Sequence, residues 1–327
     1  MNLLVTGGAG YIGSIMAKTL RDLGHNVLIL DNFSTGNEFL VNKHPLIKLD
    51  LIDRESLFEF FNSNKFDGVF HFAAYSIVSE SMEFPEKYYR NNIIGTLNLI
   101  EAMIASNQNN LVFSSSAAIF GNPITTKVHE DHPKKPINPY GKSKLIIEGM
   151  LEDMYEAYDF NSMSLRYFNA AGADKDGEFG ELHDPETHLI PNILRSALSD
   201  DYRFRILGND YATNDGTCIR DYIHVNDLCE AHLLGLERLI AQKGCYQINL
   251  GNGSGFSVLE VLRSCERVLG KKINFEIDSR RAGDPPILVS DSSYAKQLLD
   301  WEPCYSDLDY IVESAWIWQQ KISDFGA

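Results

Sequence analysis

Short apolar runs alternate with longer amphipathic segments along the first half of the chain. Short runs bounded by turn residues predict strands, whereas longer stretches with apolar residues three and four apart predict helices. The expected strands are residues 3–5, 26–30, 46–49, 68–72, 111–114 and 162–167. The expected helices are residues 11–23, 56–62, 85–106 and 139–158. A chain that alternates strand and helix in this way places its strands in a parallel sheet with helices on both faces.

The fold class predicted for residues 1–170 is therefore α/β, with a Rossmann-type doubly wound parallel sheet. Residues 170–190 are rich in Gly, Asp, Glu and Pro, and predict a long loop. Further helices are expected at 189–199, 227–241, 258–269 and 307–320, and strands at 204–207 and 246–250. We expect residues 222–250 to return to the first sheet, and residues 171–327 to form a smaller, mixed α/β substrate-binding lobe.

Composition and charge exclude several classes of partner. Hydrophobic residues make up 44% of the 327 residues, and 29 basic residues against 45 acidic ones leave a net charge of −16. So acidic a chain is poorly suited to neutralise the phosphates of a nucleic acid or to dock on an anionic membrane. We expect neither partner, although a small anionic ligand held by a few local groups is compatible with this charge.

The five cysteines form no CxxC pair and are odd in number, so we expect free thiols in a reducing compartment and no metal site. The N-terminus lacks the basic and apolar regions of a signal peptide, and no run approaches 18 apolar residues. A cytoplasmic location is the resulting expectation.

A glycine-rich turn follows the first expected strand and opens the first expected helix. Gly7 and Gly10 allow a tight turn and close approach of a pyrophosphate, and Gly13 lets the helix pack closely on the sheet. Asp31 ends the second strand, 18 residues after Gly13, where a carboxylate accepts hydrogen bonds from ribose hydroxyls. Residues 31–37 contain no Arg or Lys for a 2′-phosphate, which favours NAD over NADP.

Three polar residues predict a redox site. Tyr140 and Lys144 lie four residues apart at the start of an expected helix and therefore share one face. A nearby ammonium favours the phenolate of a tyrosine, and so prepares it as a base. Ser116 ends an expected strand, where its hydroxyl is placed to bond a substrate oxygen and to relay a proton with Tyr140.

With these motifs the chain resembles the extended short-chain dehydrogenase/reductase family and, within it, the NAD-dependent UDP-glucose 4-epimerases over nearly its whole length. The segments that carry the resemblance are residues 5–13, 113–117, 138–144, 165–169, 216–225 and 280–284. The resemblance implies reversible inversion of C4 of UDP-glucose and UDP-galactose through a transient 4-keto intermediate, with tightly bound NAD. It also implies a homodimer that pairs the helices at 85–106 and 139–158.

The same resemblance assigns residues to two sites. On the cofactor side, besides the glycines and Asp31, it implies Tyr11, Ile12, Asn32, Asp50, Leu51, Phe72, Ala73, Ala74, Asn91, Ser114, Tyr140, Lys144 and Phe168. On the substrate side it implies Ser116, Tyr140, Asn169, Leu189, Arg220, Arg281 and Asp284. The two arginines match those that bind the diphosphate, for which a guanidinium fork is suited.

The chain departs from the family pattern at three positions. Ser76 replaces a lysine beside the pyrophosphate, and His188 replaces an asparagine in the uridine loop. Leu288 stands where some members have a tyrosine that limits the sugar pocket, so N-acetylated sugars are not excluded.

Several alternatives stay open at this point. The closest is a 4-epimerase of UDP-N-acetylhexosamines or UDP-pentoses, and a dehydrogenase that exchanges its cofactor is another. A 4,6-dehydratase is disfavoured because Ala117-Ala118-Ile119 follows Ser116 in place of acidic residues. A non-catalytic NAD-binding protein is disfavoured because it has no need of Ser116, Tyr140 and Lys144 together.

Overall fold

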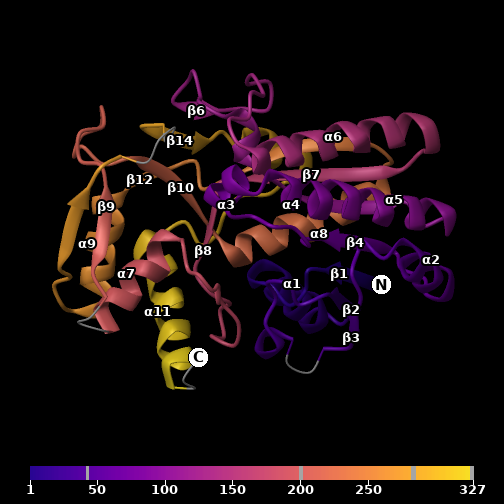
Figure 1. Ribbon diagram of the computed structural model, residues 1–327, viewed down its shortest axis with the longest axis horizontal. Helices are drawn as coiled ribbons and strands as arrows, with labels where there is room; N and C mark the ends of the chain where they lie inside the picture. Colours follow the sequence, from indigo (N-terminus) through magenta and orange to yellow (C-terminus); the bar gives the residue numbers. More distant parts are fainter. Residues whose placement is uncertain (42–43, 199–201, 281–284, 325–327) are drawn as a thin grey trace.

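A seven-stranded parallel sheet forms the centre of the larger part of the protein. The computed structural model describes residues 1–41, 44–198, 202–280 and 285–324 (Figure 1). The sheet has the strand order β11-β7-β5-β4-β1-β2-β3, and every neighbouring pair is parallel. Its strands are β1 (Asn2–Thr6), β2 (Asn26–Asp31), β3 (Leu46–Lys48), β4 (Gly68–His71), β5 (Asn110–Ser116), β7 (Asn161–Tyr167) and β11 (Cys245–Leu250). The predicted doubly wound α/β fold is thus confirmed.

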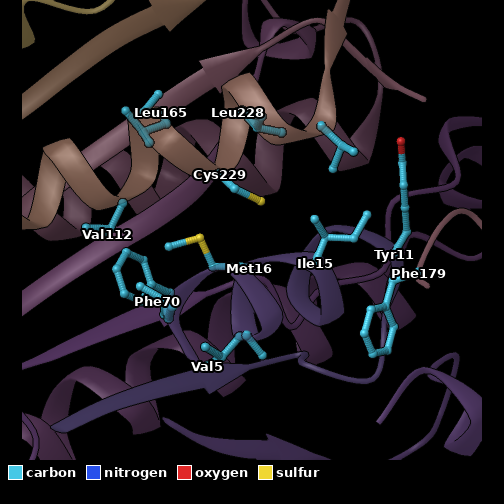
Figure 2. Packing of buried hydrophobic residues seen from close by; sticks show 14 of the residues in the cluster. Val5, Tyr11, Ile15, Met16, Phe70, Val112, Leu165, Phe179, Leu228 and Cys229 are labelled. Carbon is cyan, nitrogen blue, oxygen red and sulfur yellow. The ribbon is translucent and has the colours of Figure 1, made fainter. Parts of the chain in front are cut away.

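Helices cover both faces of this sheet, which explains why its strands are apolar on both sides. One face is covered by α1 (Tyr11–Asp22) and α8 (Val225–Ala241), and the other by α2 (Arg54–Ser63), α5 (Gly95–Ala105) and α6 (Pro139–Tyr158). Figure 2 shows the first layer, where Met16 of α1 lies among Phe70, Val112 and Cys229. Neighbouring strand residues such as Leu3 and Leu4 belong to opposite layers, because successive side chains of a strand alternate in direction.

The helix expected over residues 85–106 is interrupted. It consists of α4 (Pro85–Tyr88), a π-helical stretch η2 (Tyr89–Ile94) and α5, and it follows a short helix α3 (Val78–Glu83). The buried Asn92 accepts a bond from the backbone N–H of Tyr75 at 2.9 Å and donates to its carbonyl at 3.0 Å. This pairing ties the wider turn to the loop after β4, and period-based reasoning could not foresee it.

The second lobe surrounds its own apolar core. This core is formed mainly by α7 (Leu189–Leu198), α9 (Val258–Leu269), α11 (Leu308–Asp324) and β9 (Phe204–Leu207). β9 pairs with β13 (Phe275–Asp278), and a mixed sheet contains β12 (Gly255–Ser257), β10 (Ile219–His224), β14 (Ile287–Ser290), β6 (Lys127–Val128) and β8 (Asn169–Ala171). The remaining elements are α10 (Ser293–Leu299), η1 (Glu38–Leu40) and η3 (Ala117–Phe120).

The two lobes are interwoven along the sequence. β8 begins the segment expected to be a loop and pairs with β10, whereas β6, from the first half of the chain, pairs with β14. No helix within the described ranges is long and apolar enough to span a bilayer.

Candidate functional site

One crevice of about 1500 Å³ runs along the carboxyl ends of the parallel strands. It includes the point between β1 and β4 where the order of the strands reverses, which is where open α/β sheets bind ligands. Every described residue predicted for the cofactor and substrate sites lines this crevice. Arg281 and Asp284 lie outside the described residues.

The glycine-rich turn at the start of α1 leaves no room for side chains. Gly7 has a φ of +73°, and a Cβ on it would lie 2.5 Å from the backbone nitrogen of Ala73. A Cβ on Gly13 would lie 2.2 Å from the carbonyl oxygen of Gly7. Gly10 is the N-cap of α1, and it has no side chain that could accept a bond from the first N–H groups of the helix. These N–H groups are therefore available to a phosphate.

Polar groups at the ends of β2 and β3 form the next part of the crevice wall. Asp31 is buried, and its carboxylate accepts bonds from the N–H groups of Ala9 at 2.9 Å and Phe33 at 2.8 Å. Burial raises the pKa of Asp31, while these backbone bonds oppose that rise. Asn32 donates to Asp50 at 3.0 Å, and this bond links the residues that follow the two strands.

Ser116, Tyr140 and Lys144 converge at the end of β5. Tyr140 lies in the first turn of α6 and interacts with Ser116, and both side chains line the crevice. The amine of Lys144 donates to the carbonyl of Ser114 at 2.7 Å and lies 5.8 Å from the centre of the Tyr140 ring. The asparagine N-cap Asn138 and the proline at the first helical position fix where this helix begins.

Burial dominates the electrostatics of this trio. It raises the pKa of Tyr140, and the hydrogen bond with Ser116 lowers it only in part. Burial also lowers the pKa of Lys144 to about 7, against an opposing effect of Glu148. Desolvation thus opposes the phenolate that a nearby ammonium favours, because it penalises the charged forms of both side chains. The phenolate needs additional positive charge in the crevice.

A buried ion pair holds α6 in register with the sheet. Glu148 lies one turn after Lys144, and Arg166 of β7 donates to it twice, at 2.9 and 2.8 Å. Ser115 of β5 donates to the same carboxylate at 2.6 Å. Glu148 and Arg166 are almost completely buried, so this bridge fixes the helix against the two strands next to the Tyr140–Lys144 face.

The lowered pKa of Lys144 makes the stability of the protein depend on pH. Between pH 7 and 10.5 the unfolded chain binds a proton at Lys144 that the folded chain has released. Stability is therefore expected to rise with pH in this window, by up to about 1.4 kcal/mol per pH unit from this group. Urea unfolding between pH 7 and 9 tests this, and Lys144→Met should give a flatter profile. An unchanged slope in that variant would contradict the assignment.

The substrate end of the crevice is formed by both lobes. Asn169 donates to the carbonyl of Asp221 at 2.8 Å, and Arg220 donates to the carbonyls of Ile219 at 2.6 Å and Pro285 at 2.8 Å. These bonds orient both side chains at the wall of the crevice. Leu189 lines it at the first residue of α7.

The three departures from the family pattern, Ser76, His188 and Leu288, also line the crevice. Leu288 packs near Phe168 in a small apolar cluster with Ala117. The sequence interpretation missed Tyr167 and Lys87, which line the same crevice. Tyr167 is hydrogen-bonded to Ser114. Its place between Arg166 and the predicted site residue Phe168, in the segment 165–169, could have indicated that it also belongs to the site.

Comparisons with known proteins agree with this geometry. Residues 3–251 match the NAD dependent epimerase/dehydratase family. The chain is 46% identical to a UDP-glucose 4-epimerase of Halalkalibacterium halodurans, over 98% of this chain and 96% of that protein. It is 45% identical to the UDP-glucose 4-epimerase of Brucella ovis, solved in complex with NAD, with a TM-score of 0.92 over 96% of this chain and 97% of that one. The UDP-Glc/GlcNAc 4-epimerase of Campylobacter jejuni is 40% identical, with a TM-score of 0.84 over 98% and 99% of the chains.

Proposed function

Because the chain belongs to the NAD dependent epimerase/dehydratase family, we propose that it inverts C4 of UDP-glucose and UDP-galactose as an isomerase. The observation that carries this proposal is the convergence of Ser116, Tyr140 and Lys144 in the crevice that also contains the glycine-rich turn and Arg220. One crevice thus contains a turn that suits the pyrophosphate of a dinucleotide, side chains that can transfer a proton, and an arginine that can bind a diphosphate. Its volume of about 1500 Å³ suits two nucleotides that lie end to end.

The residues present fit NAD. The uncapped N-terminus of α1 faces the crevice for the pyrophosphate, and Asp31 lies at the end of β2 for the ribose. NAD, when bound, supplies the group that removes the hydride from C4 of the sugar and returns it. The positive charge of its nicotinamide also favours the Tyr140 phenolate, which the chain alone disfavours.

The chain's own residues bind the sugar and move its proton. Tyr140 takes the proton of the sugar 4-hydroxyl, and Ser116 bonds the same oxygen and shares in the relay. Arg220 and Asn169 hold the diphosphate while the 4-keto sugar turns and presents its other face. Tyr140 then returns the proton, and the configuration at C4 is inverted.

The decisive experiment is conversion of a substrate panel by the purified chain without added NAD. UDP-glucose, UDP-galactose, UDP-N-acetylglucosamine and UDP-xylose are incubated separately, and the product sugars are resolved. We expect interconversion of the first two, and nicotinamide released from the denatured protein. Absence of both would contradict the proposal, whereas conversion of the N-acetylated sugar or pentose would widen the substrate range.

Asp31→Asn should weaken binding of NAD by at least about 10-fold, since hydrogen bonds to a charged acceptor contribute about 1.5–3 kcal/mol. The amide keeps the size of the side chain, and its oxygen can still accept from Ala9 or Phe33. Equilibrium binding of NAD measures the effect, and UDP affinity serves as the internal control. Equal losses for both ligands would indicate a general disruption and contradict a ribose contact.

Arg220→Met should weaken binding of UDP by about 10–100-fold, because a charge-assisted bond to phosphate is lost. NAD affinity should change much less, since the cation lies at the other end of the crevice. Calorimetry with UDP and with NAD separates the two effects. Arg54→Met is the matched control, because Arg54 is an exposed arginine paired with Glu101 on the outside of the sheet.

The same proposal includes a homodimer that pairs the helical segments at residues 85–106 and 139–158 with their copies. Ile94 of η2 and Ile146 of α6 support it, since both are apolar side chains more than two-fifths exposed. Light scattering coupled to size exclusion measures the mass. A mass of one chain at micromolar concentration would contradict this part of the proposal.

A further inference from the structure

Four ligand-type side chains gather in the loop between β8 and α7. Glu181 and His183, and then Glu186 and His188, form two Glu-x-His pairs separated by two residues. One donor atom from each of the four lies within 4.8 Å of all the others. The sequence predicted no metal site, because the five cysteines have no metal-ligand spacing and the four residues lie in a segment predicted to be a loop.

The distances inside this cluster suit a small cation. Nδ1 of His188 lies 2.5 Å from Glu181 and 2.9 Å from Glu186. Nδ1 of His183 lies 3.0 Å from Glu181 and 4.0 Å from Oε2 of Glu186. A tetrahedral ion with bonds of about 2.0–2.1 Å separates its ligands by about 3.3 Å. Three of the four nitrogen–oxygen distances are shorter than this ligand separation and one is longer, so small side-chain shifts would produce a tetrahedral arrangement.

A second observation comes from the buried carboxylate of Glu186. Its side chain is only 1% exposed, and its Oε1 accepts from the N–H groups of Thr187 and His188, each at 2.8 Å. Its Oε2 is buried without a hydrogen-bond partner. A buried carboxylate oxygen that lacks a donor is costly unless it is paired or coordinates a cation. This oxygen is also the one that faces His183.

We propose that Glu181, His183, Glu186 and His188 form a binding site for a divalent transition-metal ion, and that Zn²⁺ fits it best. Imidazole nitrogens and carboxylate oxygens are both ligands of Zn²⁺, whereas Ca²⁺ and Mg²⁺ prefer oxygen ligands only. The two carboxylates balance the charge of the ion. The histidine side chains are 31% and 46% exposed and line the crevice, so the ion has a path of entry.

The place of the site in the fold gives it a structural role. The ring of His183 packs edge-on against Tyr11 at the start of α1, with ring centres 6.4 Å apart. The indole of Trp318 donates to the carbonyl of Glu181 at 2.8 Å, and α7 begins directly after His188. With all four positions taken by protein, the ion has no open coordination site and fixes the conformation of the loop whose His183 packs against α1. This inference does not depend on the proposed reaction.

The test is metal binding by the untagged full-length chain. Protein treated with a chelator and dialysed is titrated with ZnCl₂ against a chromogenic competitor, and the bound zinc is counted by mass spectrometry. We expect one ion per chain, with release of protons, because the imidazoles must be neutral to coordinate. Co²⁺ bound at the same site should show the intense visible bands of four-coordinate cobalt.

Two matched pairs of variants assign the site. Glu186→Gln keeps the size of the side chain and should lower zinc affinity by at least about 10-fold, while Glu178→Gln in the same loop should not. His183→Ala should act like the first variant, and His129→Ala, at an exposed position, should leave affinity unchanged. Absence of stoichiometric zinc binding would overturn the proposal. So would equal affinity in the Glu186 and His183 variants and their controls.

Discussion

Replacing Tyr140 with phenylalanine is expected to lower kcat by about 10³-fold while NAD stays bound. Removal of a positioned acid–base group costs typically 10²- to 10⁴-fold in rate. The ring contributes its apolar surface in either residue, so the cofactor wall of the crevice is preserved. The substitution removes only the phenolic oxygen, which interacts with Ser116 and must accept the proton of the sugar.

The measurement compares turnover of UDP-galactose with the nicotinamide content of the same preparation. Tyr158→Phe makes the same chemical change at an exposed position on the same helix and should leave kcat unchanged. If Tyr140→Phe retained full activity, Tyr140 would be removed from the mechanism. If it lost its nicotinamide as well, the loss of rate would reflect cofactor binding, and the proposed role as a base would lose its support.

Glu148→Ala is expected to destabilise the protein by about 3–5 kcal/mol, because it leaves the Arg166 guanidinium buried without its counter-charge. Arg166 is only 1% exposed and donates twice to Glu148. The hydroxyl of Ser115 also loses its acceptor. Since these bonds join α6 to β5 and β7, the loss of stability should come with a misplaced Tyr140–Lys144 face and a lower kcat.

Chemical unfolding followed by circular dichroism measures the change in stability. Glu152→Ala is the matched control. Glu152 lies one turn further along the same helix at an exposed position, and the same substitution there changes the helix propensity equally. We expect its effect to be within about 0.5 kcal/mol of zero. Equal destabilisation by both variants would mean that the ion pair contributes little, and that α6 is held by its apolar face.

The sequence by itself determined the order of elements in the first lobe. Apolar periods of about two and 3.6 residues reflect local geometry, so they locate β1, α1 and α6 to within a few residues. The positions of the glycine turn and of Asp31 were likewise predictable. The turn directly joins β1 to α1, and Asp31 ends the strand that pairs with β1. The division at residue 170 stays a prediction. β11 lies in the first sheet, within the segment for which such a return was expected, whereas local patterns do not reveal that β6 pairs in the second sheet.

The tertiary structure alone decided which distant groups meet and how strongly they are desolvated. Glu148 and Arg166 are separated by 18 residues and are charged, so nothing local predicts that they are buried together. Burial also raises the pKa of Tyr140, an effect that the sequence alone does not reveal. The four ligands at 181–188 are close in sequence, yet only the folded loop turns their donor atoms toward one another. Desolvation and non-local contact depend on the whole packed chain, and a pattern in a single segment does not contain them.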